Sequence, residues 1–307
     1  MLAVENIKKS YGKKEVIHGI TFSVKKGESF GLLGPNGAGK STTISMISGL
    51  QSIDSGDITI NGVSVKKEPM KSKKLIGVVP QDIALYPTIS AMENLVFWGK
   101  MYGLSGKHAK QKAKEVLEIV GLTDRAKDKV GTFSGGMKRR VNIGAALMHN
   151  PELLIMDEPT VGIDPQSRNH ILETVKMLNK QGMTVIYTSH YMEEVDFLCE
   201  RIGIVDGGNV IATGTKKDLC DRLAGGSIQR IRVDQIKEQF LRKLRTIEDI
   251  GEVIVNEDVI EIVGAEQSLS HIIQVADKEN TKVLSIEVQE PNLESLFLQL
   301  TGRKLRD

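Results

Sequence analysis

Apolar positions change their spacing along the chain, and these changes divide it into segments. Residues 1–30 contain short alternating stretches such as VIHGITFSV, separated by Gly and Lys-Lys turns. A period of two is typical of strands in an antiparallel sheet, and we expect this sheet to lie at the edge of a larger domain.

From ESFGLLG onward, strand-like runs alternate with helical segments. LLIMDE (153–158) and TVIYTSH (184–190) are almost entirely apolar before they end in polar residues. Strands buried on both faces of a parallel α/β sheet have this pattern, and ligands bind at their carboxyl ends. Residues 88–128 instead repeat apolar positions at helical spacing, which predicts a helical subdomain, about residues 85–150, inserted into the sheet domain.

The pattern starts again after AGGS, a predicted linker at residues 224–227 that follows a predicted helix at 218–223. The segments downstream of it read strand, helix, strand, strand, helix, strand, which is the ferredoxin-like order, and a last helix ends at Gly302. We therefore predict an α/β protein with a large domain at 1–223 and a small α+β accessory domain at 228–307.

Composition and charge exclude several classes of protein. No apolar run approaches the roughly 18 to 20 residues that a spanning helix needs, and MLAVENIKKS lacks the apolar stretch of a secretory signal, so we expect a cytoplasmic protein. With 41 basic and 39 acidic residues the net charge is +2, and only 4% of the residues are aromatic. This composition gives no reason to expect nucleic acid as a partner.

The segment GPNGAGKST, residues 34–42, matches the phosphate-loop pattern G-x-x-x-x-G-K-[ST] between a predicted strand and a predicted helix. Glycines allow such a loop to wrap around phosphates with its N–H groups inward. Lys40 would reach the β- and γ-phosphates, and Ser41 would offer its hydroxyl to Mg²⁺. A glycine-rich turn that only caps a helix is the alternative, and the flanking strand and helix argue against it.

Polar residues at the ends of the strand-like runs are candidates for hydrolytic chemistry. At the end of LLIMDE, Asp157 would hold Mg²⁺, while Glu158 would orient and polarise the attacking water. His190 ends the next apolar strand, and Gln81 follows IGVV, so both would lie at the same sheet edge, with Gln81 able to ligate Mg²⁺. Tyr11 would stack on adenine. An ordinary surface or loop position is the alternative for each of the last three residues.

A second predicted anion site lies in TFSGGMKRR, residues 132–140. Ser134, Gly135 and Gly136 stand at a predicted helix entrance, where N–H groups and the helix dipole favour phosphate. The basic residues that follow, 138–140, are most simply explained as a solvated helix face.

Taken in order, these motifs and VGID resemble the motif set of ATP-binding cassette (ABC) ATPases over roughly the first 220 residues. The resemblance implies that ATP is bound by Tyr11, Gly34, Pro35, Asn36, Gly37, Ala38, Gly39, Lys40, Ser41 and Thr42. It implies catalytic roles for Glu158, His190 and Gln81, and metal ligation by Ser41, Gln81 and Asp157.

The resemblance also implies a dimer. In ABC ATPases two cassettes pair head to tail, so Ser134, Gly135 and Gly136 would bind the γ-phosphate held by the partner's Lys40. Asp164 would lie at the seam of a homodimer, or of a heterodimer with a second ABC subunit. The signature departs from the usual pattern at Phe133, where leucine is usual, and at Met137, where glutamine is usual.

The tail EPNLESLFLQLTGRKLRD resembles the ending of bacterial drug-export ATPases of the daunorubicin-resistance type and of nodulation-factor exporters. We therefore expect an exporter ATPase that drives a separate integral membrane permease from the inner face of the cell membrane. The permease would contact whichever apolar residues after the Gln81 motif are exposed, among Leu85, Tyr86, Leu95, Phe97 and Trp98. The alternative for each of them is packing in the core of the helical subdomain.

Other classes of protein remain alternatives. An importer ATPase is disfavoured by the tail alone. A soluble ABC ATPase acting on translation would carry two cassettes in one chain, and one acting on DNA repair would carry long insertions. A phosphate-loop GTPase or kinase would have no need of FSGGM.

Overall fold

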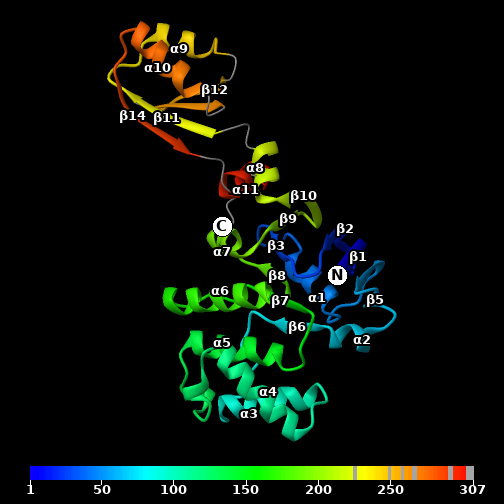
Figure 1. Cartoon of the computed structure of the whole chain (residues 1–307). Coiled ribbons are helices and arrows are strands. Elements are labelled where there is room, and N and C mark those ends of the chain that lie inside the picture. Colours follow the sequence, from blue (N-terminus) through cyan, green and yellow to red (C-terminus); the bar gives the residue numbers. More distant parts are fainter. Residues whose placement is uncertain (224–226, 248–249, 257–258, 265–267, 290–292, 302–307) are drawn as a thin grey trace. The chain divides into compact units, whose positions relative to one another are not determined.

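The computed structural model (Figure 1) describes residues 1–223, 227–247, 250–256, 259–264, 268–289 and 293–301. The chain divides into two compact units, Met1–Thr215 and a second that begins at Lys216. The helix predicted at 218–223 is α8 (Lys216–Leu223), which is grouped with the second unit. Of the predicted linker, residues 224–226 lie outside the described residues, as does the predicted helix end at Gly302.

The amino-terminal segment forms the predicted antiparallel sheet, with the strand order β2-β1-β4-β5. Its strands are β1 (Leu2–Tyr11), β2 (Lys14–Val24), β4 (Ser55–Ile60) and β5 (Val63–Ser64). Alternate residues of β2, such as Ile20 and Phe22, are buried while their neighbours are exposed, as the period of two predicts.

A second sheet has the order β10-β9-β3-β8-β7-β6 and holds the chemistry-bearing strand ends. Neighbouring strands from β9 to β6 are parallel, and β10 is antiparallel at the edge. The strands are β3 (Ser29–Leu33), β6 (Ile76–Val79), β7 (Leu153–Asp157), β8 (Thr184–Thr188), β9 (Arg201–Asp206) and β10 (Asn209–Thr215). The two runs predicted as doubly buried strands are β7 and β8, whose residues are buried almost throughout.

A single apolar core joins both sheets to helix α1 (Lys40–Ile47). Phe22 and Ile58 contribute to it from the first sheet, Ile47 from α1, and Leu153 and Ile186 from the second sheet. This packing fixes the amino-terminal end of α1 relative to the strand ends. Helices α2 (Pro69–Lys74), α6 (Pro165–Lys180) and α7 (Met192–Leu198) also belong to this unit.

Residues 91–147 contain the predicted helical subdomain, whose helices lie together below β6 in Figure 1. These are α3 (Ala91–Met101), α4 (Gly106–Ile119) and α5 (Gly135–Leu147), with 3₁₀ turns at Thr123–Arg125 and Val130–Thr132. A capping box between Ser90 and Glu93 starts α3. Leu95, Val116 and Val120 are fully buried, as the helical spacing predicts.

The second unit contains the elements in the predicted order, and its sheet is antiparallel with the order β12-β13-β11-β14. The elements are β11 (Ser227–Val233), α9 (Glu238–Leu244), β12 (Ile250–Asn256), β13 (Val259–Gly264), α10 (Ser268–Lys278), β14 (Val283–Gln289) and α11 (Leu293–Thr301). Its core is separate and centres on Ile231, Phe240, Ile260 and Ile272. Among the described helices of the whole chain, none has the length and apolar character needed to cross a membrane.

His149, two residues after α5, anchors the helical subdomain to the sheet. Its Nε2 lies 2.9 Å from the carbonyl oxygen of Ile76, and its ring stacks on Tyr102 at 3.7 Å between centroids. Since the carbonyl only accepts, Nε2 carries a proton. The other ring nitrogen, Nδ1, is buried and has no hydrogen-bond partner among the described residues. Burial lowers the pKa of His149, and the bond to Ile76 only partly opposes this shift.

Stability should therefore depend on pH through His149. A histidine whose pKa is lower in the folded state stabilises fully above its unfolded pKa of about 6.5, and this stabilisation is lost as the pH falls through the folded value. His149→Gln keeps an N–H donor but does not titrate, so it should flatten the fall in unfolding free energy between pH 7 and pH 5. Denaturant titrations of both proteins test this, with exposed His108→Gln as the control. Equal slopes for His149→Gln and wild type would contradict the assignment.

Candidate active site

The segment between β3 and α1 forms a tight loop with little room for side chains. Gly37 and Gly39 have φ angles of 77° and 105°, in the left-handed region that favours glycine. Gly34 lies against β9, where a Cβ would be 2.2 Å from the carbonyl oxygen of Val205. These constraints explain the spacing of the glycines, and the resulting loop has the form of a phosphate cradle.

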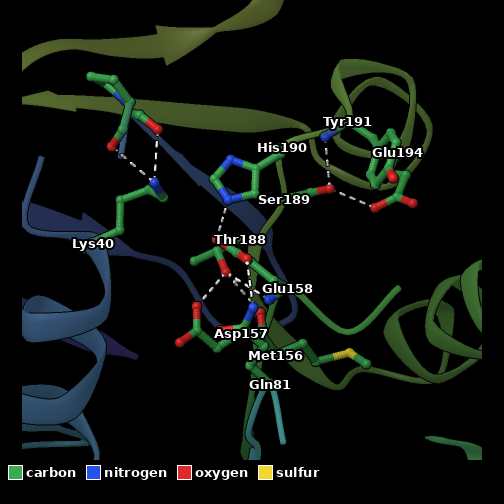
Figure 2. A network of polar contacts seen from close by, with 12 residues as sticks. Lys40, Gln81, Met156, Asp157, Glu158, Thr188, Ser189, His190, Tyr191 and Glu194 are labelled. Atoms are coloured by element: carbon green, nitrogen blue, oxygen red, sulfur yellow. Dashed lines mark hydrogen bonds and ion pairs between the residues drawn. The ribbon is translucent and has the colours of Figure 1, made fainter. Parts of the chain in front are cut away.

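Lys40 is the first residue of α1 and is only 5% exposed. Its Nζ donates to the carbonyl oxygens of Gly34 (2.7 Å) and Pro35 (3.2 Å), as Figure 2 shows. Burial lowers the pKa of Lys40, while the negative charges of Glu158 and Asp157 act in the opposite direction. A buried cation held by neutral carbonyls is well suited to bind an anion.

Thr188 joins the ends of β7 and β8 through one hydroxyl group. The parallel register pairs it with Asp157. Its Oγ1 donates to Asp157 Oδ1 at 2.7 Å and accepts from the backbone N–H of Glu158 at 2.9 Å. Burial raises the pKa of Asp157, against which the Thr188 bond and the charge of Lys40 act. One hydroxyl therefore fixes the orientation of the first acid and the backbone of the second.

Glu158 brings the three predicted catalytic side chains together (Figure 2). One carboxylate oxygen, Oε1, lies 2.6 Å from His190 Nε2, and the other, Oε2, accepts from Gln81 Nε2 at 3.3 Å. The residue is 8% exposed and has a φ of 47°, an unusual conformation for glutamate. The contact with His190 lowers the pKa of Glu158, although burial opposes this, so the carboxylate is ionised at neutral pH.

Oxygen donors suited to Mg²⁺ lie near the loop. Asp157 ends β7, and Gln81 follows β6 by two residues. Ser41, next to Lys40 on the first turn of α1, is exposed. Carboxylate, amide and hydroxyl oxygens are the ligands that Mg²⁺ prefers. The chemistry of this donor set therefore fits the predicted metal.

Glu194, in α7, bonds residues beside the site and was not predicted from the sequence. Its Oε2 accepts from the hydroxyls of Thr160 (2.8 Å), Tyr187 (3.0 Å) and Ser189 (2.6 Å). The guanidinium of Arg168 lies 3.4 Å from its other oxygen. Thr160 lies in the loop that carries Glu158, and Ser189 lies in the loop that carries His190. The network therefore holds these loops relative to each other.

The signature residues form a second cluster at two helix starts. Ser134 is the N-cap of α5, and its Oγ accepts from the backbone N–H three residues on, at 3.2 Å. Asp164 is the N-cap of α6 and accepts from Ser167 N–H at 2.9 Å, a contact that lowers the pKa of Asp164. Gly135 is exposed, whereas Gly136 is buried against Ser167. The structure thus places the signature beside Asp164.

The two departures from the usual signature leave this cap intact. The N–H that bonds Ser134 belongs to the backbone of Met137, so the cap does not depend on that side chain. Phe133 is 5% exposed, and the guanidinium of Arg125 lies 5.5 Å from its ring centroid. Phe133 therefore keeps a buried apolar side chain at the position where leucine is usual.

Tyr11, at the end of β1, belongs to neither cluster. It is 46% exposed, and its hydroxyl accepts from Gln51 Nε2 at 3.1 Å. Its ring is thus accessible, and stacking on adenine stays a prediction.

The prediction of a solvated basic face at residues 138–140 is wrong for its two arginines. Arg139 is 3% exposed, and Arg140 is half-buried with Nη1 donating to the carbonyl oxygen of Val120 at 3.1 Å. A guanidinium can be buried where backbone carbonyls satisfy its donors, a possibility that charge patterning along a helix does not reveal.

Comparisons with known proteins agree with this architecture. Residues 17–161 match the ABC transporter family. The linearmycin resistance ATP-binding protein LnrL of Bacillus subtilis is 65% identical, and the match covers 100% of both chains. The Nod factor export ATP-binding protein I of Rhizobium etli is 39% identical over 98% of this chain and 93% of that protein.

Two solved structures extend the comparison to three dimensions. An ATP-binding subunit of an ABC transporter superposes with a TM-score of 0.66 at 32% identity, covering 72% of this chain and 92% of that one. A dimeric ATP-binding cassette in a post-hydrolysis state, bound to ADP and Pi, gives a TM-score of 0.64 at 29% identity, covering 70% of this chain and 98% of that one.

The two signature glycines should respond differently to an added methyl group. A Cβ on Gly136 would lie 2.2 Å from Ser167 Cβ, whereas one on Gly135 would meet Ile163 Cδ1 at an ordinary 3.6 Å. Gly136→Ala should therefore destabilise the fold by about 1–3 kcal/mol through overpacking, and Gly135→Ala should not. Chemical denaturation of the pair tests this. Equal stability of both variants would show that α5 and α6 are not in close contact.

Proposed function

The chain belongs to the family of ABC transporter ATP-binding proteins, and on that basis we propose that it is the ATP-hydrolysing subunit of an export system. Members of the family are ATPases, so ATP hydrolysis is its reaction. The observation that carries the proposal is the contact of Glu158 with both Gln81 and His190, at a sheet edge beside buried Lys40. The named relatives that act in resistance and in Nod factor export support the direction of transport.

Nucleotide binding is assigned to the loop at residues 34–42. ATP phosphates replace the carbonyls of Gly34 and Pro35 as partners of Lys40, which gives this buried cation a charged acceptor. The adenine ring stacks on Tyr11. Mg²⁺ is assigned to Ser41, Gln81 and Asp157, and when bound it neutralises charge on the phosphates.

Glu158 is assigned to the attacking water. Its carboxylate is ionised and has an oxygen that can accept a proton from water or polarise it. His190 and Gln81 hold that carboxylate from opposite sides, which fixes its direction before the reaction.

The second half of each site is assigned to the signature of the other subunit. Ser134, Gly135 and Gly136 start α5, where unpaired N–H groups and the helix dipole attract anions. We assign them to the γ-phosphate held by the partner's Lys40, with Asp164 at the seam. The complex is thus a head-to-tail dimer, either of two copies or with a second ABC subunit, that binds two ATP.

Export requires contact with a separate membrane permease, and we assign this contact to the segment after Gln81, on the cytoplasmic face of the membrane. Tyr86 is 48% exposed and packs edge-to-face on Phe97, which packs in the same way on Trp98. Leu85, Phe97 and Trp98 are half-buried. Leu95 is fully buried and belongs to the subdomain core, so it is not part of this surface.

Glu158→Gln tests the proposal directly. The amide cannot act as a base, so hydrolysis should fall by about 10²- to 10⁴-fold while ATP binding is kept. ATP should then trap a dimer of the variant that size-exclusion chromatography separates from the monomer.

Glu152→Gln provides the matched control, since it makes the same change just before β7, at a half-buried position where Glu152 bonds Asn61 and pairs with Lys26. It should hydrolyse ATP like wild type. Wild-type turnover of Glu158→Gln, or binding of ATP without dimer formation, would count against the proposed function.

A further inference from the structure

Arg139 connects the signature helix to the segment that carries Gln81. The side chain extends from α5, is 3% exposed, and donates from Nη1 to the carbonyl oxygen of Pro80 at 2.6 Å. From Nη2 it donates to the carbonyl oxygen of Gln81. Both terminal nitrogens of one guanidinium therefore bond successive carbonyls of the same loop.

Asn142 holds the continuation of that loop from the next turn of α5. It is also 3% exposed, and its Oδ1 accepts from the backbone N–H of Ala84 at 3.2 Å. Its Nδ2 donates to the carbonyl oxygen of Asp82 at 3.5 Å. Together the two side chains bond backbone groups of residues 80–84, so this segment is attached to α5 along its length.

The charge of Arg139 is costly where it lies, which argues for a specific role. Its terminal nitrogens donate to carbonyl oxygens, and its Nε is buried with no hydrogen-bond partner among the described residues. Burial lowers the pKa of Arg139, against which the negative charge of Asp82 acts. An apolar side chain of similar volume would avoid the cost of burying a charge. Such a side chain could not donate hydrogen bonds to two carbonyls of the loop at once. We call the attachment of residues 80–84 to α5 by Arg139 and Asn142 the grip.

Both ends of this connection lie at sites that the proposed function assigns to ATP. Ser134 starts α5 about 7.5 Å along the helix axis from Arg139, at 1.5 Å per residue. At the other end, the Gln81 side chain lies 3.3 Å from Glu158. The signature faces the partner's nucleotide, whereas Gln81 faces the nucleotide of its own subunit.

We propose that Arg139 and Asn142 are positioning residues that make residues 80–84 and α5 move as one body. Docking of the signature onto the partner's ATP is then transmitted to Gln81, which contacts Glu158 in the same chain, and this couples the two ATP sites of the dimer. The grip itself is independent of the proposed function, whereas the coupling depends on it.

Steady-state kinetics test the positioning role. Arg139→Met keeps the volume but removes the donors, and leaves the Lys40 loop unchanged. Its kcat should fall at least about tenfold, with KM for ATP within about threefold of wild type. Arg139→Lys, which can still bond one carbonyl, should recover part of the rate.

Two neighbours on α5 serve as controls. Lys138→Met removes a half-buried charge and should hydrolyse ATP like wild type. Arg140→Met breaks bonds to carbonyls at residues 120 and 121 instead of the Gln81 segment, so it measures the cost of losing a buried arginine from this helix. If Arg139→Met and Arg140→Met lose the same activity for the same loss of stability, Arg139 is merely structural and the proposal is overturned.

Hydrogen exchange separates the grip from the coupling. Without nucleotide, Asn142→Leu should raise exchange at residues 82–84 at least about tenfold, since the Ala84 amide loses its acceptor. Arg139→Met should raise it at least about tenfold as well, because the segment loses its attachment at the carbonyls of Pro80 and Gln81. In the Glu158→Gln background, ATP should slow exchange in this segment, and adding Arg139→Met should abolish that slowing while the dimer still forms.

Unchanged exchange at residues 82–84 in the nucleotide-free variants would overturn the grip. Slowing by ATP that persists with Arg139→Met would overturn the coupling. Absence of any ATP-dependent dimer in Glu158→Gln would instead contradict the proposed function, and with it the coupling, while the nucleotide-free comparison would still decide the grip.

Discussion

The parallel pairing of β7 with β8 determines the geometry of the site. It sets Asp157 opposite Thr188, so that one hydroxyl bonds the carboxylate of the first acid and the backbone of the second. Glu158 is then turned toward His190 at the end of β8 and toward Gln81 beyond β6. Because a register shift of one residue would turn every side chain to the other face, the whole arrangement depends on this pairing.

The second cluster depends on a different constraint, the close approach of α5 and α6. Gly136 permits it, since a Cβ there would overlap Ser167. The same helix that presents the signature at its start holds the Gln81 segment through Arg139. In the proposed function, α5 therefore contacts one nucleotide site directly through the signature and the other through residues 80–84.

Much of the fold could be predicted from the spacing of apolar residues. β7 and β8 are nearly continuous apolar runs that end in polar residues, and parallel strands bring such ends to one edge, which is why Glu158 and His190 could be placed together. The order of the motifs along the chain predicted the other residues of the candidate site. Arg139 and Glu194 could not be found in this way, because helical spacing does not distinguish a buried, bonded polar residue from an exposed one. The one sign in the sequence that Glu194 is buried is that it lies four residues before Leu198, on the same face of a helix. The hydroxyls that it binds come from other segments of the chain, so the sequence did not reveal them.

In the proposed dimer, each ATP site is composed of the phosphate loop of one subunit and the signature of the other. The most direct test of this arrangement is the ATPase activity of a heterodimer, purified through two different tags, that joins a Lys40→Ala subunit to a Ser134→Arg subunit. Each variant alone should be inactive as a homodimer. The heterodimer should recover part of the activity, up to about half the wild-type rate, because one undamaged loop then faces one undamaged signature. A purified heterodimer as inactive as both homodimers, with ATP bound at its intact loop, would contradict this arrangement.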